Sequence, residues 1–383
     1  MARKTIEKNI AYDDVRKLYY VTLVWGMQEN GKYKKTTKTT RNKKEAKQIL
    51  RDHEKAMAAG TAVAPVKNTL VDAVEAYIRY KELDLAKTTI SGYRNILKNH
   101  IKPYFKDTLI QKVTVQMLQD FRVHETRKGL DNNSISKYFA LLHSVFKDAC
   151  NKDIIAKNPV EKMDRISLKK KEHEFMNTQE IAELCNSVAG TKLELPVTLA
   201  VYLGLRRGEV LGLRWQDVDF SMGVLRVDNT RTKAGSDVIV KEPKTEKSRR
   251  AFIMPKVVRE VLLKAQNEQQ EIKAKHKRYN DSGYVVTRHD GTPFSPNYLS
   301  DIFREHVKMQ GLKPIRFHDL RHAFASIANS VGVPMSEISA TMGHSNQGVT
   351  EMVYTHDFAE KRVVAINAVA GAIDEAKLER EAC

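Results

Sequence analysis

The chain has 383 residues, enough for two or three domains, and its apolar content of 42% can fill sizeable cores, which excludes a disordered chain. Its formal net charge of +18 indicates an acidic polymer as partner. The charge is concentrated toward the N-terminus: residues 1–67 carry 16 Lys and Arg against 7 Asp and Glu, and residues 68–175 carry 20 against 14. A solvated, lysine-rich surface is the alternative explanation.

The three cysteines, Cys150, Cys185 and Cys383, form no C-x-x-C pair, which argues against a disulfide framework or a zinc site. No apolar segment follows Met1-Ala2-Arg3-Lys4, so we expect no signal peptide. No window approaches 18 apolar residues, so we expect no membrane span. These features predict a reduced, intracellular protein without a metal site or cofactor.

Residues 1–60 are predicted to form a small β-sheet with one helix. Residues 18–25 are rich in β-branched and aromatic side chains, Asn30-Gly31 is a hairpin turn signal, and residues 33–40 suit an exposed strand with a basic face. Residues 42–57 suit a helix. The charge favours a DNA-docking module over a plain α/β domain. The candidate DNA contacts in this strand are Lys34, Lys35 and Lys38.

After a linker over residues 58–67, residues 68–162 are predicted to be a helical domain. Thr69 with Asp72 has the pattern of a capping box. Further helix starts are expected near Thr88, Thr114 and Asn133, and Asn158-Pro159 closes the block. A second linker is expected over residues 163–174, where three further candidate phosphate contacts follow one another: Lys169, Lys170 and Lys171.

Residues 175–383 are predicted to form the third domain, with a helix starting near Asn177. An apolar helical stretch over residues 195–213 is interrupted at Gly204-Leu205-Arg206. Four short strands are expected in this domain, at residues 224–227, 238–240, 251–254 and 284–287. The predicted fold class is therefore multidomain and mainly α, with small β-sheets.

Several basic side chains of this third domain suit chemistry on a phosphodiester. Such chemistry needs cations on the non-bridging oxygens, a placed nucleophile and an acid for the leaving oxygen. Arginine suits the first task because its planar fork binds two oxygens, and Arg206 and Arg321 are the candidate pair. Glu209 lies three residues after Arg206 and can orient it. Alone, this Arg–Glu pair would be an ordinary surface ion pair.

Four more residues complete the candidate set. Lys244 lies in a predicted β-hairpin and can protonate a leaving oxygen, with Lys241 and Lys247 as rivals. His318 shares a helix face with Arg321. His344 follows a glycine, which permits close approach. The nucleophile candidate is the only tyrosine after Arg321, Tyr354, although any one of these residues would more often be structural.

The order of these motifs carries a specific resemblance. Gly-Leu-Arg-x-Gly-Glu at 204–209, Pro-Lys-Thr at 243–245, His-x-x-Arg at 318–321, Gly-His at 343–344 and Tyr-x-His at 354–356 resemble the catalytic boxes of tyrosine recombinases, the integrases of phages and conjugative transposons. The match covers residues 175–360 most firmly. Residues 68–162 look like the core-site-binding domain of that family, and residues 1–60, more loosely, like its arm-site-binding domain.

The resemblance implies a site-specific recombinase that integrates and excises a mobile element. Arg206 and Arg321 would stabilise the transition state, Lys244 would be the general acid and His318 an acid/base or phosphate contact. His344 would hold the phosphate, Glu209 would support the site, and Tyr354 would form a 3′-phosphotyrosine link. Strand exchange would pass through a Holliday junction.

The family also implies partners and a location. The partners would be double-stranded DNA with core and arm attachment sites, three further copies of the chain in a homotetramer, and an excisionase and DNA-bending host factors. The location would be the bacterial cytoplasm, at the nucleoid. The apolar segment over residues 363–373 would dock on an adjacent protomer, or otherwise on its own domain.

Two details depart from the family pattern: Met342 stands where leucine is common, and the ten residues from His344 to Tyr354 are about one more than expected. Two alternatives share part of the pattern. A type IB topoisomerase-like enzyme would rejoin the same strand, and a site-specific DNA-binding protein would not cut. A metal nuclease fits poorly, because no cluster of acidic and histidine ligands stands out.

Overall fold

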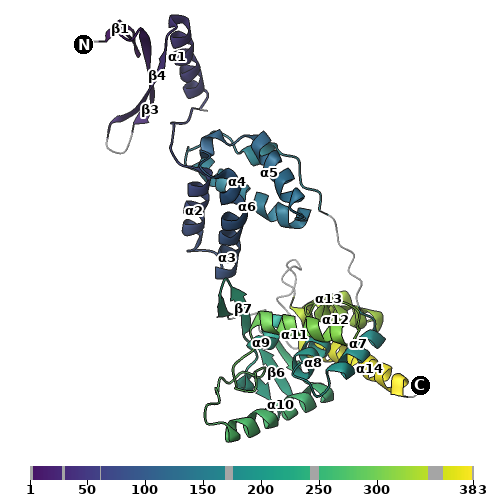
Figure 1. The fold of residues 1–383 in the computed structure, drawn as a ribbon. Coiled ribbons are helices and arrows are strands. Elements are labelled where there is room, and N and C mark those ends of the chain that lie inside the picture. The colour runs from purple at the N-terminus through teal and green to yellow at the C-terminus, as the bar shows by residue number, and fades with distance from the viewer. Residues whose placement is uncertain are drawn as a thin grey trace. The chain divides into compact units, whose positions relative to one another are not determined.

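A computed structural model describes residues 3–27, 31–60, 62–168, 176–241, 250–343 and 357–381. The side chains of residues 335, 357–365 and 379–381 are not described. The chain forms two compact units, Met1–Lys171 and Glu172–Cys383 (Figure 1). No helix of the described ranges is both long and apolar enough to cross a membrane.

The first unit begins with a four-stranded antiparallel sheet in the order β1-β2-β3-β4, covered by helix α1 on one face (Figure 1). The elements are β1 (Lys4–Glu7), β2 (Ile10–Asp13), β3 (Leu18–Met27), β4 (Tyr33–Thr40) and α1 (Lys43–Ala58). The predicted strands over 18–25 and 33–40 and the helix over 42–57 are confirmed. The short strands β1 and β2 were not predicted. Their own sequence signal is weak, and they are ordered by pairing, β2 with β3 and β1 with β2.

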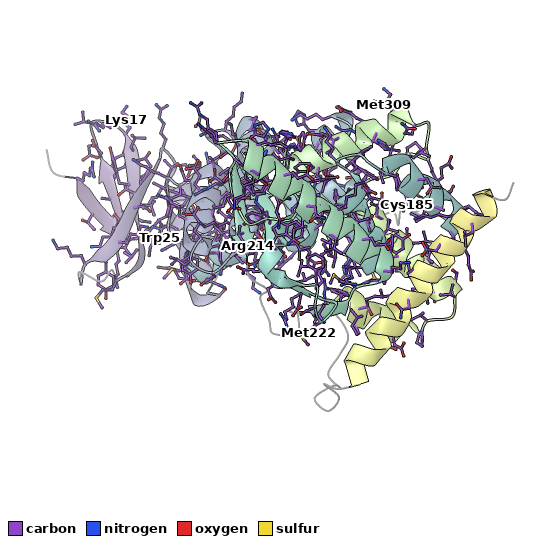
Figure 2. The ribbon with its side chains drawn as sticks, turned by 90° about the horizontal axis from the view of Figure 1, so that it is seen from below. Lys17, Trp25, Cys185, Arg214, Met222 and Met309 are labelled. Atoms are coloured by element: carbon purple, nitrogen blue, oxygen red, sulfur yellow. The ribbon has the colours of Figure 1, made fainter. Side chains whose placement is uncertain are left out.

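The core of this sheet lies between β3 and α1, and it is small. It contains Ile10, Val21, Leu23 and Ala46. The Asn42 side chain caps α1 by accepting from the Lys44 amide at 2.8 Å. Trp25 on β3 packs edge-on against His53 of α1 and donates to Thr36 on β4 at 2.7 Å (Figure 2).

The register of β4 separates the three predicted DNA-contacting lysines. Lys38 pairs with Val21 and therefore lies on the α1 side of the sheet, because directly paired residues share a face. Lys34 shares that side by alternation along β4, whereas Lys35, paired with Val24, lies on the open side. The role of these three lysines as DNA contacts remains a prediction, with Lys34 and Lys38 on one face of β4 and Lys35 on the other.

The second part of the first unit is helical and has its own core. Its elements are α2 (Leu70–Lys81), α3 (Lys87–Ile96), η1 (Leu97–Ile101), α4 (Lys102–Phe105), η2 (Ile110–Lys112), α5 (Val115–Arg127), α6 (Asn132–Asn151) and η3 (Pro159–Lys162). The predicted capping box of Thr69 and Asp72 is present, and Thr114 caps α5 as predicted. The cap of α6 is Asp131, two residues before the predicted Asn133. Lys169, Lys170 and Lys171 lie outside the described residues.

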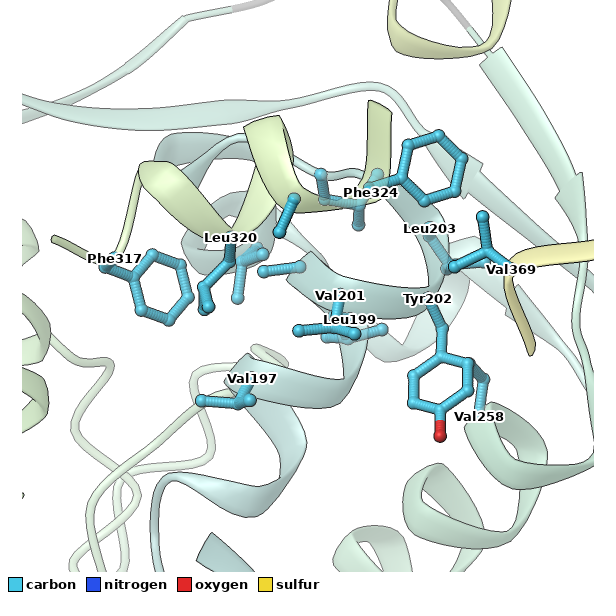
Figure 3. Packing of buried hydrophobic residues seen from close by; sticks show 14 of the residues in the cluster. Val197, Leu199, Val201, Tyr202, Leu203, Val258, Phe317, Leu320, Phe324 and Val369 are labelled. Atoms are coloured by element: carbon cyan, nitrogen blue, oxygen red, sulfur yellow. The ribbon is translucent and has the colours of Figure 1, made fainter. Parts of the chain in front are cut away.

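The second unit surrounds an apolar helix, α8 (Glu194–Leu203), of which eight consecutive residues are buried. Figure 3 shows Val201 and Leu203 of α8 among side chains from other helices, such as Val258, Phe324 and Val369. A helix that is apolar on all sides must be covered on all sides. The helices that cover α8 are α7 (Thr178–Val188), α10 (Lys256–Lys275), α12 (Asp319–Ser330) and α14 (Asp357–Glu381).

The helices of the second unit are α7 (Thr178–Val188), α8, α9 (Arg207–Gly212), η4 (Trp215–Asp217), α10 (Lys256–Lys275), α11 (Pro296–Met309), α12 (Asp319–Ser330), α13 (Met335–Met342) and α14 (Asp357–Glu381). Helix α7 begins after a capping box formed by Asn177 and Glu180, as predicted. Cys185 on α7, labelled in Figure 2, is a free thiol, as is Cys150 in the helical part of the first unit. Burial raises the pKa of Cys185 to about 11, so its thiol stays protonated at neutral pH.

The strands of the second unit form two small sheets. One has the order β5-β6-β9, and the other is the β7-β8 hairpin. The strands are β5 (Val218–Asp219), β6 (Val224–Val227), β7 (Thr230–Ala234), β8 (Asp237–Lys241) and β9 (Arg250–Ile253). Three predicted strands are confirmed, but the fourth, over residues 284–287, is wrong. Tyr284 and Thr287 make only isolated bridges, because Val285 and Val286 are buried in the core rather than paired in a ladder.

Helix α14 packs on its own unit in this single chain. Ile366, Val369 and Ile373 are fully buried in the core. The Tyr202 hydroxyl of α8 donates to Asp374 at 3.2 Å and accepts from Lys377 at 3.1 Å. Docking of this segment on a neighbouring protomer remains a prediction.

Replacing Ile373 with Ala should lower the free energy of unfolding of the DNA-free chain by about 2–5 kcal/mol, because it leaves a cavity against α8. Urea unfolding followed by circular dichroism measures this loss. Glu375→Ala, at an exposed position of α14, is the matched control. Equal stability of the two variants would contradict docking of α14 on its own unit in the free chain.

Candidate functional site

The site is built around the break between α8 and α9. Gly204 has φ +62°, and a Cβ there would lie 2.8 Å from Cδ1 of Phe324. Glycine is therefore needed both for the positive φ and for the close approach of Phe324. The break turns the chain so that Arg206 caps the N-terminus of α9 instead of continuing α8. The predicted interruption of the apolar stretch at residues 204–206 is therefore confirmed.

Arg206 is held by Glu209 and by the end of α13. Its Nη1 lies 2.8 Å from Glu209 Oε1, and its backbone amide donates to Glu209 Oε2 at 2.8 Å. Its Nη2 donates to the Gly343 carbonyl at 2.9 Å. The side chain keeps 37% of its surface exposed, so the guanidinium is fixed and still accessible to an anion. The predicted contact between Arg206 and Glu209 is present.

Arg321 lies in the first turn of α12 and is only 2% exposed. Its Nη1 donates to the Gly204 carbonyl at 2.7 Å and its Nη2 to the Met342 carbonyl at 2.5 Å. Burial and the nearby Arg206 lower the pKa of Arg321 to about 9, and Glu209 opposes this shift. The group stays cationic at neutral pH, so an anion that enters would stabilise a charge that water does not solvate.

Glu209 is the buried acid of this cluster, with a side chain 7% exposed. Burial alone would raise the pKa of its carboxyl, but Arg250 and Arg206 outweigh that effect and lower it. Glu209 is therefore ionised at neutral pH. Its Oε2 is 2.7 Å from Arg250 Nη2 and 4.0 Å from Arg321 Nη1, so one carboxylate touches three arginines.

His318 precedes α12 and faces the same cleft as Arg206. The ring of His322 lies 5.2 Å from the His318 ring, nearly perpendicular to it. Burial has the largest effect on the His318 imidazole and lowers its pKa, and the nearby His322 and Arg321 lower it further. Its neutral form is therefore favoured at neutral pH, which suits an acid/base role or a hydrogen bond to an oxyanion.

The remaining predicted site residues, Lys244, His344 and Tyr354, lie outside the described residues. The described residues on either side of these segments nevertheless show which elements the segments connect. The segment with Lys244 joins Lys241 at the end of β8 to Arg250 at the start of β9. The segment with His344 and Tyr354 begins after Gly343, whose carbonyl accepts from Arg206.

An open cleft of about 530 Å³ adjoins Arg206 and His318. Its other lining residues include four arginines that were not predicted as site residues: Arg207, Arg231, Arg304 and Arg316. Arg304 and Arg316 each pair with an aspartate at 2.8 Å, Asp301 and Asp319 respectively.

Arg207 and Arg231 carry most of the uncompensated charge of the cleft. Arg207 donates to the Ser300 hydroxyl at 2.5 Å and Arg231 to the Phe294 carbonyl at 2.8 Å. Within the described ranges neither has an acidic partner at ion-pair distance, and burial lowers the pKa of both. Arg207 directly follows Arg206 in the sequence, a hint that a second arginine borders the site. Arg231 had no comparable signal.

This arrangement can bind a tetrahedral anion together with the neighbouring anionic groups of the polymer to which that anion belongs. Two guanidiniums are fixed by carbonyls and a carboxylate before any ligand arrives, which is the preorganisation that stabilises charge in a transition state. No cluster of three or more His, Cys, Asp or Glu side chains able to hold a metal ion occurs in the described part of the chain.

Comparisons with known proteins agree with this geometry. The sequence model of the phage integrase family matches residues 171–361, and that of the phage integrase SAM-like domain matches residues 69–167. The ICEBs1 integrase of Bacillus subtilis is 27% identical over 76% of this chain and 79% of its own length. The tyrosine recombinase XerC-like protein of Caldanaerobacter subterraneus is 27% identical over 92% of this chain and 96% of its own length.

Solved structures share the fold. The Tn1549 transposon integrase in complex with transposon right end DNA superposes with a TM-score of 0.62 at 19% identity, over 82% of this chain and 100% of that chain. A lambda integrase tetramer bound to a Holliday junction superposes with a TM-score of 0.56 at 17% identity, over 92% of this chain and 99% of that chain. With its two adjoining family matches and these relatives, the chain belongs to the phage integrase family and is a tyrosine-type site-specific DNA recombinase.

Proposed function

We propose that the enzyme cuts DNA by attack of the Tyr354 hydroxyl on a phosphodiester held by Arg206 and Arg321. The observation that carries this proposal is the shared anchor of the two guanidiniums. Arg206 donates to the Gly343 carbonyl and Arg321 to the Met342 carbonyl, directly before the segment that contains His344 and Tyr354. The segment of sequence that contains Tyr354 therefore follows directly on the residues whose carbonyls fix the two arginines.

The chemistry proceeds in two balanced steps. The Tyr354 oxygen bonds to phosphorus as the bond from phosphorus to the 5′ oxygen breaks, and Lys244 gives that oxygen its proton. His318 accepts the phenol proton or holds a phosphate oxygen, together with His344. A 5′ hydroxyl of the partner strand then gives its proton to Lys244 and bonds to the phosphorus of the 3′-phosphotyrosine, while the bond from phosphorus to the Tyr354 oxygen breaks and Tyr354 regains its proton from the group that accepted it. The bond energy is conserved, so neither ATP nor another cofactor is needed.

The outcome is strand exchange between two duplexes through a Holliday junction, which serves both integration and excision. The test mixes two differently labelled attachment-site duplexes with the full-length protein and resolves the products on a native gel. A junction containing both labels supports recombination. Nicking and rejoining within one duplex would indicate a topoisomerase-like activity instead, and binding without cutting a DNA-binding protein.

We further propose a division of labour along the chain. Residues 1–60 bind arm sites, residues 68–162 bind the core site, residues 163–174 link them to the catalytic residues 175–383, and the lysines at 169–171 touch phosphate. The separate apolar cores before and after residue 60 support this division, as does the net charge of +9 on residues 1–67. Four protomers act on two duplexes, with an excisionase and DNA-bending host factors setting direction.

Deleting residues 1–60 should weaken binding to arm sites and make the salt dependence of that binding shallower. Each phosphate contact contributes roughly 0.9 to the slope of log affinity against log salt, so the loss of two or more contacts lowers the slope by about 2 or more. Fluorescence anisotropy over a salt series measures it, with core-site DNA as control. An unchanged slope would mean that the charge of residues 1–60 is merely solvated.

The two cleft arginines should bind DNA phosphates beside the cleaved one. Replacing Arg207 and Arg231 together with Gln should lower the salt slope of core-site binding by about 2 and weaken affinity at every core sequence alike. Arg278→Gln with Lys277→Gln, an exposed pair outside the cleft lining, is the matched control for charge. Equal slopes for the two double variants would contradict a role of this cleft in DNA binding.

A further inference from the structure

A third arginine is buried at the site, and nothing in the catalytic motifs marks it. Arg250 is the first residue of β9 and pairs with Val227 of β6. Side chains alternate along a strand, so Arg250 points to the same side as Phe252, into the core. Its side chain is 1% exposed, which leaves it no surface with which to touch DNA.

Arg250 joins two parts of the site that are far apart in sequence. Its Nη2 lies 2.7 Å from Glu209 Oε2, and its Nη1 donates to the Met342 carbonyl. The same carbonyl accepts from Arg321 Nη2 at 2.5 Å. The fit is tight, because a Cβ at Gly343 would lie 2.1 Å from Arg250 Nη1, and Gly343 has φ +65°.

The contact with Glu209 also sets the distance between Glu209 and Arg321. Glu209 Oε2 is 2.7 Å from Arg250 and 4.0 Å from Arg321. Without Arg250, the nearest guanidinium to Glu209 Oε2 apart from Arg206 would be that of Arg321, at 4.0 Å, and a direct Glu209–Arg321 pair would neutralise the charge that Arg321 offers to the phosphate. The Met342 carbonyl would at the same time lose one of its two hydrogen-bond donors. The Met342–Gly343 turn would therefore be held less firmly.

We propose that Arg250 is a positioning residue for strand cleavage. It holds Glu209 and the Met342–Gly343 turn so that Arg206 stays fixed and Arg321 keeps its charge available to the phosphodiester. This inference rests on the proposed function of Arg206 and Arg321.

The test uses full-length protein with Arg250→Met, Arg250→Lys and the control Arg226→Met. Arg226 is an exposed arginine on β6, paired with Ala251 of β9. Core-site affinity and the single-turnover rate of covalent adduct formation are measured for each from pH 6 to pH 9. Folding is followed by circular dichroism.

Arg250→Met should bind core DNA within about 3-fold of the wild type and cleave it about 100-fold more slowly, in the range found when a preorganised donor is lost. Its rate should also rise with pH where the wild-type rate does not. The groups facing Glu209 are Arg206, Arg321 and Arg250, and removing one of these cations raises the pKa of the carboxyl, so that higher pH restores the ionised form. A merely structural role would not create this pH dependence.

Arg250→Lys keeps the charge but cannot reach both Glu209 and the Met342 carbonyl, so it should cleave about 10-fold more slowly than the wild type. If Arg250→Met does not fold, the rate of Arg250→Lys tests the inference instead. Wild-type rates in Arg250→Lys, or a slow Arg250→Met with the pH profile of the wild type, would overturn the inference. Absence of an adduct in the wild type itself would instead overturn the proposed function.

Discussion

Replacing Tyr354 with Phe is expected to abolish the covalent protein–DNA adduct while DNA binding stays within about 2-fold of the wild type. Phenylalanine keeps the ring and removes only the attacking oxygen, so the loss falls on the chemical step. Removing a nucleophile from a preorganised site typically lowers the rate by at least about 10,000-fold.

The adduct is detected as a protease-sensitive band on a denaturing gel after incubation with nicked core-site DNA. Tyr298→Phe is the matched control, because its hydroxyl accepts only from Lys192 within the described hydrogen bonds, at 3.0 Å. An adduct in Tyr354→Phe, mapped by mass spectrometry to another residue, would refute the assignment of the nucleophile.

Replacing Arg206 with Ala is expected to lower the cleavage rate by about 100- to 1,000-fold with little loss of affinity. The guanidinium contributes most where charge develops on the phosphate in the transition state. The fold should survive, because Glu209 keeps Arg250 as a partner at 2.7 Å. Arg206 also keeps 37% of its surface exposed, so its removal leaves no closed cavity.

Single-turnover cleavage and equilibrium binding, measured side by side, separate the two effects. Arg226→Ala removes an exposed arginine of the same unit and should change neither quantity. Cleavage by Arg206→Ala at the wild-type rate would remove Arg206 from the mechanism. An equal loss in binding and in rate would reassign it to ground-state binding of DNA.

Much of the local structure could be predicted because its causes are local. The caps at Thr69, Thr114 and Asn177 satisfy helix-terminal amides with side chains a few residues away. The break at Gly204 follows from a residue that tolerates positive φ. Such signals survive in a single sequence.

The wrong or missing predictions concern elements whose structure depends on partners. Strand β2 is ordered by pairing with β3 and β1 by pairing with β2, and Val285 and Val286 are buried without joining a ladder. Which lysines of β4 share a face follows from the register of the strand, which their charge alone does not reveal.

The sequence by itself determined the family, and with it a candidate set that runs from Arg206 to Tyr354, because motif order and residue chemistry are properties of the chain alone. Only the tertiary structure decided that Arg206, Glu209 and Arg321 meet around the Gly343 turn, and that Arg207 and Arg231 line a cleft with Arg206. The tertiary structure alone revealed that Arg250 is buried at the site, because its sequence context is that of an ordinary β-strand. The physical reason is that burial and charge compensation arise between segments distant in sequence, and no local pattern records which arginine a buried carboxylate will meet.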